Sequence, residues 1–187
     1  MATLGYFISF HTYGTWLHGR LQESVDEEHA TPGTPYLTPD APREQREGRL
    51  LKHAPVELDA ERRYVVDTTI LEVCAHRGWR LRALHVRSTH LHAVVSATPA
   101  PERIMNDFKA CATRRMREAG VLSKDNDPWS RHGSTRYLNT ENSFARAVQY
   151  VLYEQGEHLE VRCPAGWTPK VNVSQINNPP SKEPRTC

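Results

Sequence analysis

Cysteines, long apolar runs and an excess of one charge are all scarce in this chain, and each scarcity excludes a class of protein. Four cysteines are scattered through 187 residues without a Cys-x-x-Cys pair, which indicates a reduced protein rather than a disulfide framework. No apolar run is long enough to cross a membrane, and the first residues lack the basic segment and apolar core of a secretion signal. We therefore expect a cytoplasmic protein without membrane contact.

The formal net charge is only +2, from 24 Lys and Arg against 22 Asp and Glu. Any affinity for nucleic acid must then come from a local patch. The candidate basic residues of such a patch are Lys109, Arg114, Arg117, Arg131 and Arg136. They predict a basic ridge along a phosphate backbone, and the alternative is a solvated helix face balanced by nearby carboxylates. Trp16 is either a stacking platform for an unpaired base or a core residue.

Apolar periodicity and turn residues divide the chain into alternating strands and helices. Strands are predicted over residues 4–13, 79–86, 90–97 and 134–139, and helices over residues 59–76, 102–119 and 140–156. The order strand-helix-strand-strand-helix-strand is that of the ferredoxin-like split βαβ pattern. We expect an α+β fold: an antiparallel sheet with the first and third strands as central neighbours, helices on one face, and an additional C-terminal helix.

The same pattern suggests how the chain is organised. Residues 1–160 read as one domain. Residues 20–57 form a Pro-rich, charged loop or insertion with at most a short helix near residues 42–51. Residues 161–187 are polar and rich in proline, and we expect a flexible tail there.

Two histidines begin the third predicted strand. Successive side chains of a strand point to opposite faces, so His90 and His92 share one face while Leu91 points into the core. Two imidazoles on a rigid strand make half of a site for a divalent metal. Taken alone, His-x-His is weak evidence, because two histidines also share a strand face by chance. His11, on the first strand, is expected beside this pair or on the surface.

The last predicted helix carries a second candidate group. Tyr150 and Glu154 are four residues apart and therefore lie on one face of that helix. Gln155 is rotated by about 100° from Glu154 in an ideal helix, and it reaches the same point only if the helix ends before Gly156. A hydroxyl and an oxygen ligand beside two histidines would supply a nucleophile and a third metal ligand. The alternative is that Tyr150 and Tyr153 are packing residues with solvated hydroxyl groups.

Together these segments resemble a known family, the HUH single-tyrosine transposases, including insertion-sequence transposases and the small transposase-like proteins associated with bacterial repeat elements. The resemblance rests on the His-Leu-His strand and the tyrosine helix. It extends to residues 6–19, 102–120 and 129–138, and so to most of residues 4–160. Family members often have Asn or Gln as the third ligand near the tyrosine. This chain has Glu154 at that spacing and Gln155 after it, so the helical spacing favours Glu154 and the family pattern favours Gln155.

The resemblance implies a catalytic domain that cleaves and rejoins single-stranded DNA. Tyr150 would form a covalent 5′-phosphotyrosine, and Mg²⁺ or Mn²⁺ held by His90, His92 and Glu154 or Gln155 would polarise the phosphate. It implies single-stranded or hairpin DNA as partner, and we expect a monomer or homodimer. Two other functions stay open: a metal-dependent hydrolase in which Tyr150 is structural, and a nucleic-acid-binding module without catalysis.

Overall fold

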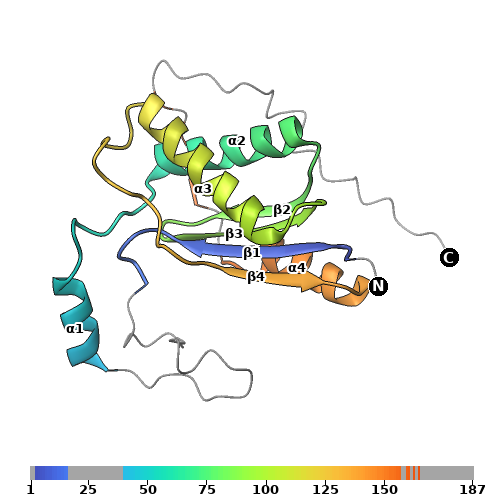
Figure 1. Cartoon of the computed structure of the whole chain (residues 1–187), viewed down its shortest axis with the longest axis horizontal. Coiled ribbons are helices and arrows are strands. Elements are labelled where there is room, and N and C mark those ends of the chain that lie inside the picture. Colours follow the sequence, from blue (N-terminus) through green and yellow to red (C-terminus); the bar gives the residue numbers. More distant parts are fainter. Residues whose placement is uncertain (1–2, 17–39, 157–158, 161, 163, 165–187) are drawn as a thin grey trace.

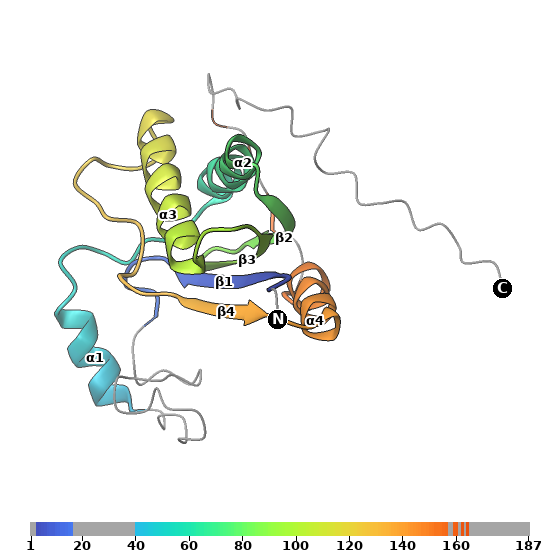
Figure 2. The ribbon, with the colours of Figure 1, turned by 45° about the vertical axis from the view of Figure 1, so that its right-hand side comes forward.

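The computed structural model describes residues 3–16, 40–156, 159, 160, 162 and 164. Residues 20–39 of the predicted Pro-rich loop, and most of the predicted tail, lie outside this part of the chain. Within it, four strands form one sheet with α2 and α3 on one face and α4 against the other (Figures 1 and 2). The short helix α1 (Ala41–Arg49), expected near residues 42–51, stands apart from the sheet (Figure 1).

The sheet contains β1 (Gly5–His11), β2 (Arg80–Val86), β3 (His90–Ser96) and β4 (Ser134–Leu138). Their order is β2-β3-β1-β4, and each neighbouring pair is antiparallel. The first and third strands are therefore the central neighbours, and the predicted split βαβ arrangement is confirmed. The described part of the chain contains no helix that is both long and apolar enough to cross a membrane.

The main core fills the face that α2 (Ala60–Arg77) and α3 (Pro101–Glu118) cover. Alternate residues of β1 and β3 point into it, because side chains of a strand alternate between faces. These residues are buried, namely Tyr6, Ile8, Phe10, Leu91, Ala93 and Val95. The helix α2 begins at Asp59, whose side chain accepts a hydrogen bond from the Arg62 amide, and it ends at Gly78 with φ of 68°. Both caps are where the sequence predicts them.

The opposite face carries a smaller core under α4 (Glu141–Tyr153). The helix begins with a capping box between Thr140 and Ser143. Ala147 and Val151 pack against buried residues of β2, β3 and β4, namely Ala83, Val94 and Leu138. Because α4 covers only part of this face, the ends of β1 and β3 near His11 and His90 extend beyond it.

One loop joins α3 to β4 and brings β4 beside β1. The Lys109 ammonium donates to the carbonyl oxygens of Ser130 at 2.9 Å and His132 at 3.1 Å, and the Trp129 indole donates to the Lys109 carbonyl. Gly133 then passes so close to β1 that an added Cβ would lie 2.7 Å from the Ser9 carbonyl oxygen. Burial of the lysine therefore fixes where β4 begins.

Candidate active site

Histidines from three strands meet on the α4 side of the sheet. His11 lies opposite His90 in the β1–β3 pair, and His85 lies opposite His92 in the β2–β3 pair. The ring centroids are 5.0 Å apart for His90 and His92, and 5.3 Å apart for His11 and His90. The shared face predicted for His90 and His92 is therefore present, and two further imidazoles extend it into a cluster.

His85 is the member of this cluster that the sequence pattern did not assign. Regular alternation along β2 would place Leu81, Ala83 and His85 on one face of the sheet. The β2–β3 register shifts between Leu81 and Ala83, so the three residues do not share a face. Leu81 packs on the main core, whereas Ala83 lies in the smaller core under α4. The β-bulge thus turns His85 toward α4, where its Nδ1–H donates to the Val151 carbonyl oxygen at 3.1 Å.

Burial keeps the imidazoles of His11, His90 and His92 neutral near pH 7. Burial, with smaller contributions from the neighbouring histidines, lowers the pKa of His92 to about 3. Burial and the nearby His90 lower the pKa of His11 to about 4, and the pKa of His90 is lowered mainly by burial. Neutral imidazoles present nitrogen lone pairs near pH 7, so a metal ion displaces no proton from them.

Tyr150 lies over this cluster. Its ring centroid is 5.7 Å from that of His92 and 6.0 Å from that of Phe7, which stacks on His92 at 5.4 Å. The tyrosine is 39% exposed, so its hydroxyl-bearing ring is open to a substrate. Tyr153 is 73% exposed and lines, with Phe144, Val148 and Leu152, a hollow that does not contain the histidines. Of the two tyrosines, Tyr150 is the one placed beside the histidines.

The end of α4 decides how the two candidate oxygen ligands lie. The helix ends at Tyr153, and Glu154 is its C-cap with φ of −112°, outside the regular helical turn. The Gln155 side chain lies near the His92 ring and opposes part of the lowering of the His92 pKa, and its amide nitrogen lies 3.5 Å from the Tyr150 carbonyl oxygen. Glu154 is exposed and lines the cleft that also contains His92 and Tyr150. The early end of the helix is the condition under which Gln155 was expected to reach the site.

These residues fit a divalent metal through nitrogen and amide or carboxylate oxygen. The Nδ1 atom of His92 is buried and has no hydrogen-bond partner within the described structure. The Nδ1 atom of His90 lies 3.1 Å from the Thr89 hydroxyl oxygen, which leaves its Nε2 atom for a ligand. Among the described residues, no group of three His, Cys, Asp or Glu side chains is arranged to hold a metal. An amide such as that of Gln155 would have to complete the set.

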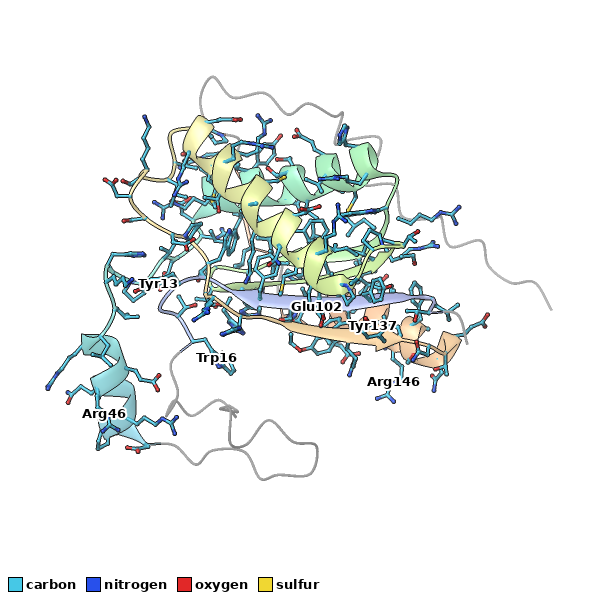
Figure 3. All side chains as sticks on the ribbon, viewed as in Figure 1. Tyr13, Trp16, Arg46, Glu102, Tyr137 and Arg146 are labelled. Atoms are coloured by element: carbon cyan, nitrogen blue, oxygen red, sulfur yellow. The ribbon has the colours of Figure 1, made fainter. Side chains whose placement is uncertain are left out.

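Two of the predicted DNA-binding residues, Arg136 and Trp16, lie beside this site, and Arg131 lies in the loop before β4. Arg136 lies over the Phe7 ring at 5.4 Å, and the Trp16 ring centroid is 4.5 Å from that of His11. Arg131 is exposed and follows Ser130, whose amide and hydroxyl both donate to the His11 carbonyl. Figure 3 shows Trp16 below the sheet, opposite α2 and α3.

The other three predicted DNA-binding residues belong to α3 and lie on the far side of the sheet. Lys109 is 9% exposed, and its ammonium is used by the carbonyl groups of the loop before β4, so a phosphate contact does not fit its placement. Arg114 lies 3.9 Å from the Glu118 carboxylate, and Arg117 donates to the Asn126 carbonyl. The predicted basic ridge of α3 is thus separated from Tyr150 by the sheet, because α3 packs on the main core.

Solved structures that are similar to this chain include two transposases. The chain is similar to a candidate transposase from Deinococcus radiodurans R1, with 18% identity, a TM-score of 0.42, and coverage of 85% of this chain and 95% of that chain. It is also similar to a REP-associated tyrosine transposase bound to a REP hairpin, with 10% identity, a TM-score of 0.41, and coverage of 80% of this chain and 66% of that chain. No family model matches, and no curated protein matches. Both structures are described as transposases.

Proposed function

We propose that this protein is a transposase-like enzyme that cleaves and rejoins single-stranded DNA through a covalent bond between Tyr150 and a 5′-phosphate. The observation that carries the proposal is the position of Tyr150, which is partly exposed with its ring 5.7 Å from the buried, neutral imidazole of His92. A tyrosine nucleophile beside nitrogen ligands on a rigid strand matches what phosphodiester cleavage needs.

In the proposed reaction the Tyr150 hydroxyl oxygen attacks phosphorus and loses its proton to solvent. The bond between phosphorus and the 3′-oxygen breaks, and that oxygen takes up a proton to become a free 3′-hydroxyl. When bound by His90, His92 and Gln155 or Glu154, Mg²⁺ or Mn²⁺ would supply Lewis-acid polarisation of a nonbridging phosphate oxygen. Because the phosphotyrosine conserves the ester linkage, a 3′-hydroxyl can attack it and rejoin strands without a nucleotide cofactor.

The protein around Tyr150 orients this nucleophile. The His85 hydrogen bond to the Val151 carbonyl holds the last turn of α4 on the sheet, and the Phe7 ring packs against both the Tyr150 ring and the His92 ring. Both contacts restrict the motion of the tyrosine relative to His90 and His92. Such restraint is what a covalent mechanism needs, because small displacements of a nucleophile are costly in rate.

The test is formation of a denaturation-resistant adduct. The protein is incubated with Mn²⁺ and labelled oligonucleotides, both single-stranded and hairpin-forming, and resolved on a denaturing gel. We expect a shifted band that is lost in Tyr150→Phe and kept in the matched control Tyr153→Phe. Cleavage without an adduct would instead identify a metal-dependent hydrolase, and binding without cleavage would identify a binding module. An adduct that persists in Tyr150→Phe and disappears in Tyr153→Phe would overturn the assignment of the nucleophile.

A further inference from the structure

A cleft opens between β4 and α4, directly beside Tyr150. Its volume is about 640 Å³. One part of its wall is formed by the site residues His92, Phe7 and Tyr150. From there it is lined by β4 and by the first turns of α4, through Arg136, Leu138, Ser143 and Arg146. The cleft is therefore continuous with the site at the nucleophile.

We propose that this cleft binds the phosphate backbone of single-stranded DNA on one side of the cleavage point, through Arg136 and Arg146. The inference rests on the proposed function and adds a substrate-binding subsite to it. A cleft of this size matches sites for small ligands, so it holds about one or two nucleotides and excludes a duplex. An anionic DNA strand is the ligand that two guanidinium groups lining one cleft favour.

The charges of the cleft carry the argument. Arg136 and Arg146 are both exposed, and neither forms an ion pair with any carboxylate in the described part of the chain. Figure 3 shows Arg146 extending from α4 on the side of the sheet opposite α2 and α3. Glu154 is the acidic residue among those lining the cleft. The balance of formal charge is therefore positive, two guanidinium groups against one carboxylate.

Two arginines of the opposite face show the contrast. Arg115 lies 2.9 Å from the Glu118 carboxylate and 3.5 Å from that of Glu72, and Arg77 lies 3.3 Å from that of Asp107. Pairing of this kind neutralises the positive charge locally. Guanidinium groups without such partners, placed beside a nucleophile, keep their charge for a ligand.

The arrangement of rings on the same face indicates the path of the bound DNA. Trp16, His11, His90 and His92 follow one another with ring centroids 4.5, 5.3 and 5.0 Å apart. Tyr150 lies at the His92 end of this row, where the cleft begins. A DNA strand whose reacting phosphate lies at Tyr150 passes over the histidines toward Trp16 on one side of that phosphate. On the other side of the phosphate it enters the cleft.

The experiment measures binding without cleavage, so that its outcome is independent of catalysis. Fluorescence anisotropy with a labelled single-stranded oligonucleotide compares the Tyr150→Phe protein with the same protein carrying Arg136→Gln and Arg146→Gln, in chelator and over a range of salt. Single-stranded DNA gives a slope of log K against log salt of about −0.7 per phosphate contact. We expect roughly tenfold weaker binding and a slope smaller in magnitude by about 1.4 for the loss of two contacts.

The matched control carries Arg114→Gln and Arg117→Gln on α3, which removes the same net charge from the far side of the sheet. We expect its affinity and salt slope to equal those of the parent, and thermal unfolding to be the same for both double variants. An unchanged slope in the cleft variant, an equal loss in the control, or an equal loss for duplex DNA would overturn the proposal. If the protein forms no adduct but the cleft arginines contribute to DNA binding as expected, the proposed reaction is rejected and the proposed subsite is not.

Discussion

The two faces of the sheet are built from alternate residues of the same strands, yet their environments are opposite. In β3, Leu91, Ala93 and Val95 are fully buried under α2 and α3. His90 and His92 alternate with these residues along β3 and point to the other face, where α4 covers only part of the sheet. One face therefore supplies the stability that holds the strands in register. The other face buries imidazoles, and their desolvation lowers their pKa values. We expect substitutions on the two faces to separate stability from activity.

The sharpest test of this separation removes both metal-binding imidazoles. We expect the His90→Ala, His92→Ala double variant to lose adduct formation by roughly a thousandfold or more, because metal polarisation contributes several kcal/mol and about 1.4 kcal/mol is tenfold in rate. Thermal unfolding should change little, and calorimetric binding of Mn²⁺ should disappear. Retained cleavage in the folded double variant would contradict a metal site on this face.

The complementary test truncates a core residue of the other face. Phe108 is fully buried between α3 and the sheet, with its ring centroid 6.0 Å from that of Trp79. We expect Phe108→Ala to lower the free energy of unfolding by about 3–5 kcal/mol through lost burial and a cavity. Urea unfolding measures this loss, with the exposed Tyr153→Ala as a control that should cost little. Comparable losses in both variants would show that the main core is not where stability resides.

Much of this contrast was predictable from the sequence, because it depends on local periodicity. The elements, their order and the shared face of His90 and His92 all follow from alternation and helical spacing. The caps at Asp59 and Gly78 were predictable for the same reason, since capping depends on nearby residues.

The features that the sequence did not reveal depend on contacts between distant segments. The bulge in β2 that turns His85 toward α4 is set by pairing with β3. The burial of Lys109 is set by carbonyl groups more than twenty residues away. Whether a basic helix faces the nucleophile is decided by which side of the sheet it packs on, and α3 packs on the side away from Tyr150.

Lys109 gives a further test of the contrast between the two faces, because it is a charged residue in the half that otherwise supplies stability. We expect Lys109→Met to lower the free energy of unfolding by about 1–3 kcal/mol, since the Ser130 and His132 carbonyl groups lose their donor. Single-stranded DNA binding and its salt slope should stay unchanged. Loss of DNA affinity at unchanged stability would instead support the phosphate contact predicted from the sequence.

Removal of the third metal ligand should have a smaller effect, on the face that carries Tyr150 and the histidines. We expect Gln155→Ala to raise the Mn²⁺ concentration needed for cleavage by about tenfold, because the Gln155 side chain lies near His92. Glu154→Ala should raise it less, since Glu154 is the exposed C-cap of α4. A metal titration of cleavage in both variants measures the difference. A larger shift in Glu154→Ala would assign the carboxylate as the ligand, and no shift in either would show that α4 supplies none.

An effect that depends on pH is expected at Asp67, a carboxyl group on α2 in the half that supplies stability. Burial raises its pKa from 3.8 to about 6. The folded state therefore holds this proton more tightly than the unfolded state, so Asp67 reduces stability as the pH rises from about 4 to about 6 and no further above that. We expect Asp67→Asn to match the parent near pH 4 and to exceed its free energy of unfolding by about 3 kcal/mol or less near pH 7, because each unit by which folding raises a carboxyl pKa corresponds to about 1.4 kcal/mol. Urea unfolding of both proteins at intervals of about one pH unit gives this difference as a curve. A difference that stays constant across this range would show that Asp67 titrates in the folded protein as it does in the unfolded chain.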